Sequence, residues 1–165
     1  MDPKRLKIIS GGQTGADRAA LDAALNAGVA CGGWCPEGRR AEDGIIPDRY
    51  PVEELLGAGY RGRSLANVRD SDGTLIFYFR TPSGGTELTL WHCIDERKPY
   101  LLIDAAEMTA ERAAERIREF VEMNEIRQLN VAGPRASGVP AIYDYVLAAI
   151  SLAFGHGDAS NDGQS

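Results

Sequence analysis

Residues for nucleophilic, metal and redox chemistry are scarce in this sequence. It contains three cysteines and two histidines among 165 residues. One histidine, His156, lies in the polar C-terminal tail, so a Ser-His-Asp triad has almost no candidate base. Cys31 and Cys35 are four positions apart, but no second Cys/His pair follows at the spacing of a zinc site. We therefore predict no catalytic residue of these classes and no bound metal, and we interpret Cys31, Cys35 and Cys93 as small core residues.

Long apolar runs and targeting signals are also missing. No apolar run approaches the ~20 residues of a membrane span, and the start, MDPKRLKIIS, lacks the apolar h-region of a signal peptide. These absences predict a cytoplasmic protein without a membrane partner. The formal net charge of −6 disfavours nucleic acids and anionic membranes as partners of the bulk surface. A small anionic ligand held by a local basic cluster is compatible with this charge.

The common phosphate-binding fingerprints do not occur either. The segment SGGQTGAD, residues 10–17, follows the apolar run LKII, but its glycines do not have the G-x-G-x-x-G spacing. No Gly-Lys-Ser/Thr sequence is present, so ATP hydrolysis by a P-loop mechanism is not expected. The segment can still hold a phosphate, because glycine permits close approach and a helix N-terminus presents free N–H groups.

Apolar runs alternate with helical patterns along the chain. The alternation predicts a single-domain α/β fold with a mostly parallel sheet over residues 1–154, followed by a disordered tail at 155–165. Residues 36–60 are rich in Pro, Gly and Arg and are predicted to be irregular. Strands are predicted at 6–10, 29–34, 74–79, 100–104 and 129–133. A first helix is predicted to end at Gly28, and further helices are predicted at 63–72, 87–98, 109–125 and about 140–154.

Some side chains can be placed on these elements. The 109–125 pattern puts Ile117 and Phe120 on an apolar face. Leu25 is predicted to face the core from the first helix, and Trp91 from the mostly apolar helix at 87–98. Trp34, at the end of a strand, is a candidate for stacking on a flat ligand ring.

Three glycine-containing turns follow predicted strands: GGQTG at 11–15, SGGT at 83–86 and GPRAS at 133–137. Ligands of parallel α/β sheets bind beyond the carboxyl ends of the strands. We therefore predict one ligand cleft walled by these three turns.

Three polar residues near these turns, Thr14, Asp17 and Glu87, have two interpretations each. Thr14 and Asp17 have the spacing of a capping box; alternatively, Thr14 binds a phosphate oxygen and Asp17 a hydroxyl or amine donor of the ligand. Glu87 is a favourable charge in a first helical turn, or a group near the reacting centre of an enzyme.

Arginine dominates the basic residues, with fifteen among 18 Lys and Arg. Its planar guanidinium suits phosphate and other oxyanions, although a general preference for Arg over Lys would explain the count equally well. Arg40 and Arg135 are the best anion-binding candidates, because they lie beside glycine-rich turns.

Four blocks in the same order, SGGQTGADRAALDAA, GGWCPEGRRAEDGIIPDRYP, NVRDSDGTLIF with SGGTELT, and LNVAGPRAS, resemble the family of molybdenum cofactor carrier proteins, the molybdenum carrier family. The resemblance covers roughly residues 6–150. The family is similar in fold to the LOG and DprA proteins, which implies a Rossmann-like, three-layer α/β domain with a nucleotide-type ligand at its carboxyl edge. It implies binding of molybdenum cofactor, a phosphorylated pterin, or otherwise of a nucleotide-like phosphate ligand, and delivery to an apo-molybdoenzyme. A homo-oligomer is also expected.

The family's motifs map onto all three turns. The LOG enzymes carry P-G-G-x-G-T-x-x-E, whereas Ser83–Glu87 is shorter and its acid follows Thr86 directly, so their glutamate is not securely present. The candidate binding residues are Gly11, Gly12, Thr14, Gly15, Asp17, Arg40, Ser83, Gly84, Gly85, Thr86, Gly133, Arg135 and Ser137.

Three functions are compatible with these turns. The first is a carrier of molybdenum cofactor or a similar ligand. The second is an enzyme that cleaves the N-glycosidic bond of a nucleoside monophosphate, with Glu87 or Asp17 near the ribose and Arg63 or Arg69 on the phosphate. The third is a sensor of a nucleotide-derived signal.

Overall fold

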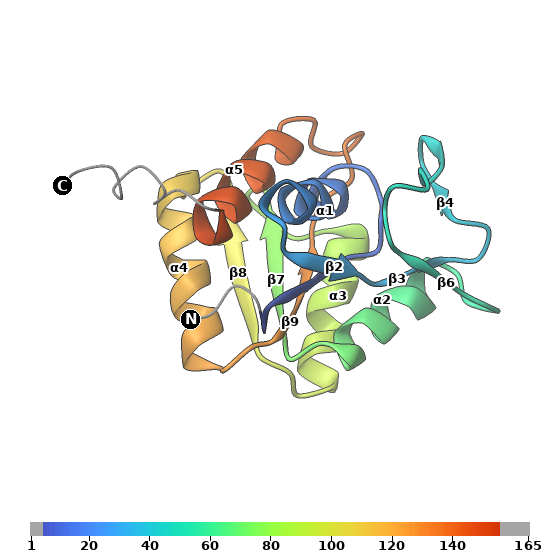
Figure 1. Cartoon of the computed structure of the whole chain (residues 1–165), viewed down its shortest axis with the longest axis horizontal. Coiled ribbons are helices and arrows are strands. Elements are labelled where there is room, and N and C mark those ends of the chain that lie inside the picture. The colour runs from blue at the N-terminus through green and yellow to red at the C-terminus, as the bar shows by residue number, and fades with distance from the viewer. Residues whose placement is uncertain (1–4, 156–165) are drawn as a thin grey trace.

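A computed structural model describes residues 5–155 of the chain; the predicted tail at 155–165 lies outside this range except for Gly155. Its centre is a five-stranded parallel sheet in the order β2-β1-β9-β7-β8, which confirms the predicted α/β class (Figure 1). The strands are β1 (Lys7–Ile9), β2 (Ala30–Gly32), β7 (Gly73–Tyr78), β8 (Tyr100–Asp104) and β9 (Gln128–Ala132). The helices are α1 (Ala16–Ala27), α2 (Tyr60–Asp70), α3 (Gly84–Asp95), α4 (Ala110–Met123) and α5 (Ile142–Phe154).

The helices cover the sheet in two layers. Helix α5 packs against α1 and α4, while α2 packs against α3 on the opposite face. This division follows from the strand order, because the connections from β1 to β2 and from β7 to β8 run in opposite directions and right-handed crossovers then place their helices on opposite faces.

The larger core lies between the sheet and the α1, α4 and α5 layer. Helix α1 contributes mainly alanines to it, which lets α5 approach closely. Ile117 and Phe120 of α4 are buried there as predicted. Across the helix pair, the Tyr143 hydroxyl donates to Asp22 Oδ2 at 2.5 Å, and burial together with this bond raises the pKa of Tyr143 to about 12.

Two core predictions were wrong. Leu25 is 43% exposed and Trp91 is 54% exposed. In α3 the buried positions are Thr86, Thr89, His92 and Cys93, so at about 100° per residue Trp91 falls on the outer side of the helix. The mostly apolar composition of α3 predicted that every side of the helix is buried, whereas only one side of it faces the sheet.

Residues 34–55 form a compact extension beside the sheet rather than an irregular segment. It contains a parallel pair, β3 (Trp34–Pro36) with β6 (Glu53–Leu55), and an antiparallel hairpin, β4 (Arg40–Ala41) with β5 (Gly44–Ile45). The Arg39 guanidinium donates to the carbonyl oxygens of Ile46, Val52, Pro47 and Tyr50, at 3.2, 2.7, 2.9 and 3.1 Å. One side chain thus satisfies backbone groups that a longer sheet would otherwise pair.

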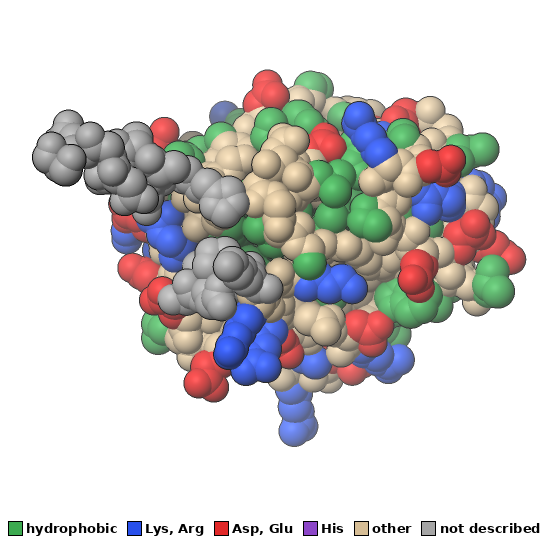
Figure 2. Space-filling view, in the orientation of Figure 1, with side chains coloured by type: hydrophobic (Ala, Val, Ile, Leu, Met, Phe, Trp, Pro, Cys, Tyr) green, Lys and Arg blue, Asp and Glu red, His purple; other side chains and the backbone are tan. Residues whose placement is uncertain are grey.

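Positive and negative side chains are mixed across the visible face of the molecule (Figure 2). This face therefore offers no extended basic surface of the kind that nucleic-acid binding needs. Among residues 5–155, no helix is both long enough and apolar enough to span a membrane.

Candidate functional site

A cavity of about 440 Å³ lies at the carboxyl ends of β1, β9 and β7, a volume within the ~300–1,000 Å³ of small-molecule sites. These three strands are neighbours and run parallel, so the turns that follow them meet at one edge of the sheet. The chain leaves β1 and β7 in opposite directions, which makes this edge the switch point of the fold. The cavity walls come from all three predicted turns and from α2: Gln13, Asp17, Tyr60, Arg63, Ser64, Ser83, Gly84, Gly85, Thr86, Gly133, Pro134 and Arg135, among others.

The turn after β7 leaves the start of α3 open. Ser83 is the N-cap residue, but its side chain makes no capping hydrogen bond. The first amides of a helix have no partner within the helix, and they carry partial positive charge. A Cβ atom built on Gly84 or Gly85 would meet nothing within 4 Å. The Thr86 N–H donates to the Ser83 carbonyl at 3.1 Å, so the open donors of this turn are the N–H groups of Gly84 and Gly85, with empty space around both residues, an arrangement suited to an anion.

Arg135 supplies a full positive charge to the same cavity. Among the described residues no acidic oxygen lies within 4.0 Å of its guanidinium, although its charge contributes, after the hydrogen bonds from Ser137 and Thr14, to lowering the pKa of Glu42. Arginine binds phosphate oxygens in a bidentate manner. Arg135 and the open turn of α3 thus make one wall of the cavity attractive to a phosphate.

The wall formed by α1 and α2 carries a buried charge pair. Asp17 is only 4% exposed, and its Oδ2 accepts from the Gln13 backbone N–H at 3.2 Å and from Arg63 Nη1 at 3.5 Å. Burial raises the pKa of Asp17, and Arg63 partly offsets this. A phosphate beside Asp17 would be repelled, so this wall suits a neutral part of a ligand.

Gly11 makes room for this pair. A Cβ atom at Gly11 would lie 1.7 Å from Arg63 Nη1. The guanidinium thus lies directly over the Gly11 backbone, and the glycine acts on the site through Arg63.

Gln13 is a cavity residue that the sequence analysis missed. It is 7% exposed, and its Oε1 accepts from the backbone N–H groups of Thr14 at 3.0 Å and Glu42 at 2.9 Å. These two bonds fix the orientation of the amide. Its Nε2 is consequently a buried donor without a partner in the described part of the chain, as is the nearby Arg63 Nε.

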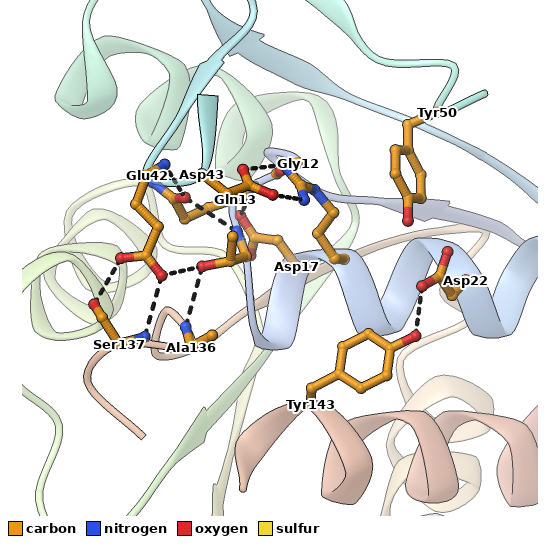
Figure 3. A network of polar contacts seen from close by, with 12 residues as sticks. Gly12, Gln13, Asp17, Asp22, Glu42, Asp43, Tyr50, Ala136, Ser137 and Tyr143 are labelled. Carbon is orange, nitrogen blue, oxygen red and sulfur yellow. Dashed lines mark hydrogen bonds and ion pairs between the residues drawn. The ribbon is translucent and has the colours of Figure 1, made fainter. Parts of the chain in front are cut away.

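Glu42 connects two of the glycine-containing turns outside the cavity (Figure 3). Its Oε1 accepts from the Thr14 hydroxyl and from the Ser137 N–H at 3.1 Å, and its Oε2 accepts from the Ser137 hydroxyl at 2.6 Å. Thr14 Oγ1 also accepts from the Ala136 N–H at 3.1 Å. The capping interpretation of Thr14 was therefore wrong: the N-cap of α1 is Gly15, and Thr14 instead ties the first turn to the third.

The neighbouring Asp43 anchors the same hairpin a second time. It accepts from Arg18 Nη1 and Nη2 at 2.6 and 2.8 Å, while Arg18 Nε donates to the Gly12 carbonyl at 2.9 Å. We call residues 40–45, with these contacts, the hairpin strap. It fixes the first turn from outside, so that the cavity side of the turn is set by contacts remote in sequence.

The strap should respond to acid. Hydrogen bonds from Ser137 and then Thr14 lower the pKa of Glu42 from 4.5. A carboxyl group with a lowered pKa stabilises the fold above its unfolded pKa, and this contribution is lost as the pH falls through the folded pKa. We expect Glu42→Gln to unfold at slightly lower urea concentration than the parent at pH 7, and the two midpoints to converge well below pH 4.5. A constant gap down to acid pH would contradict the role of the Glu42 charge.

Gly15 is required by the backbone rather than by a ligand. Its φ is +80°, and a Cβ atom would lie 2.4 Å from the Pro134 carbonyl oxygen. We expect Gly15→Ala to lower the free energy of unfolding by about 2 kcal/mol or more, because a positive φ with a ψ of −124° is a sparsely populated conformation that costs a residue with a side chain roughly 1–3 kcal/mol, and the contact adds repulsion. Urea denaturation measures this, and an unchanged midpoint would show that the crossing of the two turns is loose.

The structure divides the predicted binding residues into two groups. Gly11, Gly12, Thr14, Gly15, Arg40 and Ser137 are not among the residues that line the cavity, whereas Asp17, Ser83, Gly84, Gly85, Thr86, Gly133 and Arg135 line it. Arg40 is exposed on the strap and donates to the Glu37 carbonyl at 3.2 Å.

Other candidates also lie away from the cavity. Glu87 is exposed and does not line it, and Arg69 pairs with Glu96 at 3.1 Å. Trp34 lines a separate pocket of about 150 Å³, where its Nε1 donates to Asp70 at 2.7 Å. Of the arginines considered, Arg63 and Arg135 are the ones that reach the cavity.

Comparisons with known proteins agree with this architecture. The model of the family described as "Circularly permutated YpsA SLOG family" matches residues 8–154. The crystal structure of a protein described as "Putative molybdenum carrier protein" from Syntrophus aciditrophicus SB superposes with a TM-score of 0.90 at 42% identity, and the match covers 94% of this chain and 98% of that chain. No functionally curated protein matches the sequence. These findings confirm the Rossmann-like fold and the resemblance to molybdenum carriers, and the chain belongs to the circularly permutated YpsA SLOG family.

Proposed function

We propose that the protein is a carrier that holds a phosphorylated ligand with an aromatic head group in the cavity, and that molybdenum cofactor is its cargo. The observation that carries this proposal is the open first turn of α3 together with the exposed cation Arg135, in a cavity of about 440 Å³. The 42% identical structure is that of a protein described as a "Putative molybdenum carrier protein", which supports molybdenum as part of the cargo. Delivery to an apo-molybdoenzyme belongs to the same proposal.

The residues present fit such a cargo. The cofactor combines a terminal phosphate with a neutral, nitrogen-rich pterin. The phosphate would be held by the Gly84 and Gly85 amides and Arg135, and the pterin would lie toward Asp17 and Arg63, which also line the cavity. Among the described residues no cluster of three or more His, Cys, Asp or Glu side chains could hold a metal ion. The molybdenum would accordingly be held through its organic ligand.

One observation favours a second function, hydrolysis of a nucleoside monophosphate. Asp17 lines the cavity, and burial raises its pKa, as is common for catalytic carboxyl groups. Against this, Glu87 is exposed and outside the cavity. Asp17 already accepts two hydrogen bonds within the protein, so it is held as a binding group.

A panel of nucleoside monophosphates tests carrier against hydrolase. We expect the protein to release no free base from any of them, as followed by chromatography. General acid–base assistance is worth about 10²–10⁴ in rate, so a true hydrolase would show steady release that falls by that factor in Asp17→Asn. Such release would overturn the carrier proposal. Glu87→Gln is the matched control, because it removes a carboxylate that lies outside the cavity.

A further inference from the structure

The wall of the cavity formed by Gln13, Asp17 and Arg63 holds an unusual set of polar atoms. Gln13 Nε2 and Arg63 Nε are buried donors without a partner in the described part of the chain. Beside them, Asp17 Oδ2 accepts two hydrogen bonds, while Oδ1 accepts none from a described residue. Gln13, Asp17 and Arg63 all line the same cavity. A buried donor without an acceptor is costly, at about 1–3 kcal/mol, and such groups are typically satisfied by a ligand or water.

We infer that Gln13, Asp17 and Arg63 form a subsite for the lactam edge of an oxo-heterocycle, in which a ring carbonyl lies next to a ring N–H. This inference rests on the proposed function, since it assumes that the phosphate of the same ligand lies at α3. It extends that function by naming which heterocycles the cavity selects.

The number of donors and acceptors on these three side chains determines which edge of a heterocyclic ring they can bind. Two side chains, Gln13 and Arg63, offer donors, and a carbonyl oxygen has two lone pairs with which to accept both. A ring nitrogen has only one lone pair and would leave one of the donors unsatisfied. Asp17 offers the single acceptor that an adjacent ring N–H requires. The set therefore complements a carbonyl beside an N–H, as in hypoxanthine, guanine or a 4-oxopterin, and not the reversed pattern of adenine.

Charge fixes how the ligand lies in the cavity. Asp17 would repel a phosphate, whereas the open turn of α3 and Arg135 attract one. The phosphate end and the lactam subsite lie on different walls of the same cavity, formed by different elements. A phosphorylated oxo-heterocycle would therefore bind in one orientation, with its ring toward α1 and α2.

Inosine monophosphate and adenosine monophosphate provide a matched pair of probes. They share the ribose and the phosphate, but the carbonyl and N–H of hypoxanthine are replaced by the amine and ring nitrogen of adenine. By isothermal titration calorimetry we expect wild-type protein to bind inosine monophosphate at least about tenfold more tightly, because mispaired buried polar groups cost one or more decades of affinity.

Two variants test the atoms directly. Gln13→Glu keeps the Oε1 acceptor for Thr14 and Glu42 but turns the unpartnered donor into an acceptor, so the preference should fall to about one or reverse. Asp17→Asn should also reduce the preference for inosine monophosphate. This second variant tests the subsite if Gln13→Glu fails to fold. Gly85→Ala, at the phosphate end, should weaken both probes by the same factor and leave the ratio unchanged.

The outcomes separate this inference from the proposed function. Equal affinities for the two probes, or a preference for adenosine monophosphate, would overturn the lactam subsite while leaving a phosphate-binding cavity, provided that Gly85→Ala weakens both. A wild-type preference that survives in both Gln13→Glu and Asp17→Asn would also overturn the subsite. Failure of both probes to bind would overturn the subsite and the proposed function together.

Discussion

Gly85→Ala is expected to yield a folded protein whose affinity for inosine monophosphate is lower by about tenfold or more. The space around Gly85 is empty to 4 Å, so the added methyl meets no protein atom. Gly85 lies in α3, where alanine is favoured over glycine by about 0.5–1 kcal/mol. The melting temperature should therefore stay the same or rise. The methyl would instead occupy cavity space in front of the first amides of α3, where the phosphate must approach.

Thermal denaturation and calorimetric titration together check this expectation. Gly15→Ala is the matched control, because there the same added methyl meets the Pro134 carbonyl and should destabilise the fold. Severe unfolding of Gly85→Ala would show that the turn has a structural role. Unchanged binding in a folded Gly85→Ala would show that the phosphate lies elsewhere.

Arg135→Glu is expected to weaken binding of the same nucleotide by about 10- to 100-fold without loss of the fold. A hydrogen bond to a charged group is worth about 1.5–3 kcal/mol, and the variant also places a negative charge beside the phosphate. The Arg135 side chain is exposed and has no described acidic oxygen within 4.0 Å; its charge interacts with Glu42 only as a minor contribution to the lowered pKa of that group, so the fold should tolerate its loss.

Arg40→Glu is the charge-matched control for this variant. It makes the same change in net charge, but Arg40 is on the hairpin strap and does not line the cavity. We expect its affinity to stay within about twofold of wild type at physiological salt, where exposed charges are screened beyond about 8 Å. Equal losses in the two variants would indicate a general electrostatic effect and would contradict a specific contact by Arg135.

The position of the cavity could be predicted from the sequence because it depends on local patterns. Apolar runs alternating with helices require parallel strands, and parallel strands bring the turns at their carboxyl ends to one edge. The turns at 11–15, 83–86 and 133–137 therefore had to meet. The sequence did not predict which side chains of these turns face the cavity: Asp17 lines it and Thr14 does not.

The orientation of the side chains around the cavity and the structure of residues 34–55 could not be predicted, because they depend on contacts between residues far apart in the chain. Glu42 accepts a hydrogen bond from Ser137, which lies 95 positions away in the chain. Neither local sequence contains a pattern that predicts this bond. The same contacts turn Thr14 away from the cavity and hold the amide of Gln13 in place. Arg39, likewise, orders a segment whose composition predicted irregular structure, by donating to four backbone carbonyls.

Native mass spectrometry of the protein purified from its own source tests the central claim most directly. The carrier account predicts a wild-type protein with an additional non-covalent mass, which fragmentation identifies as a phosphorylated heterocycle and elemental analysis as containing molybdenum. Gly85→Ala, purified in parallel and shown to be folded, should have lost this mass. A wild-type protein of bare polypeptide mass, or a bound ligand without phosphate that is retained in Gly85→Ala, would contradict the account.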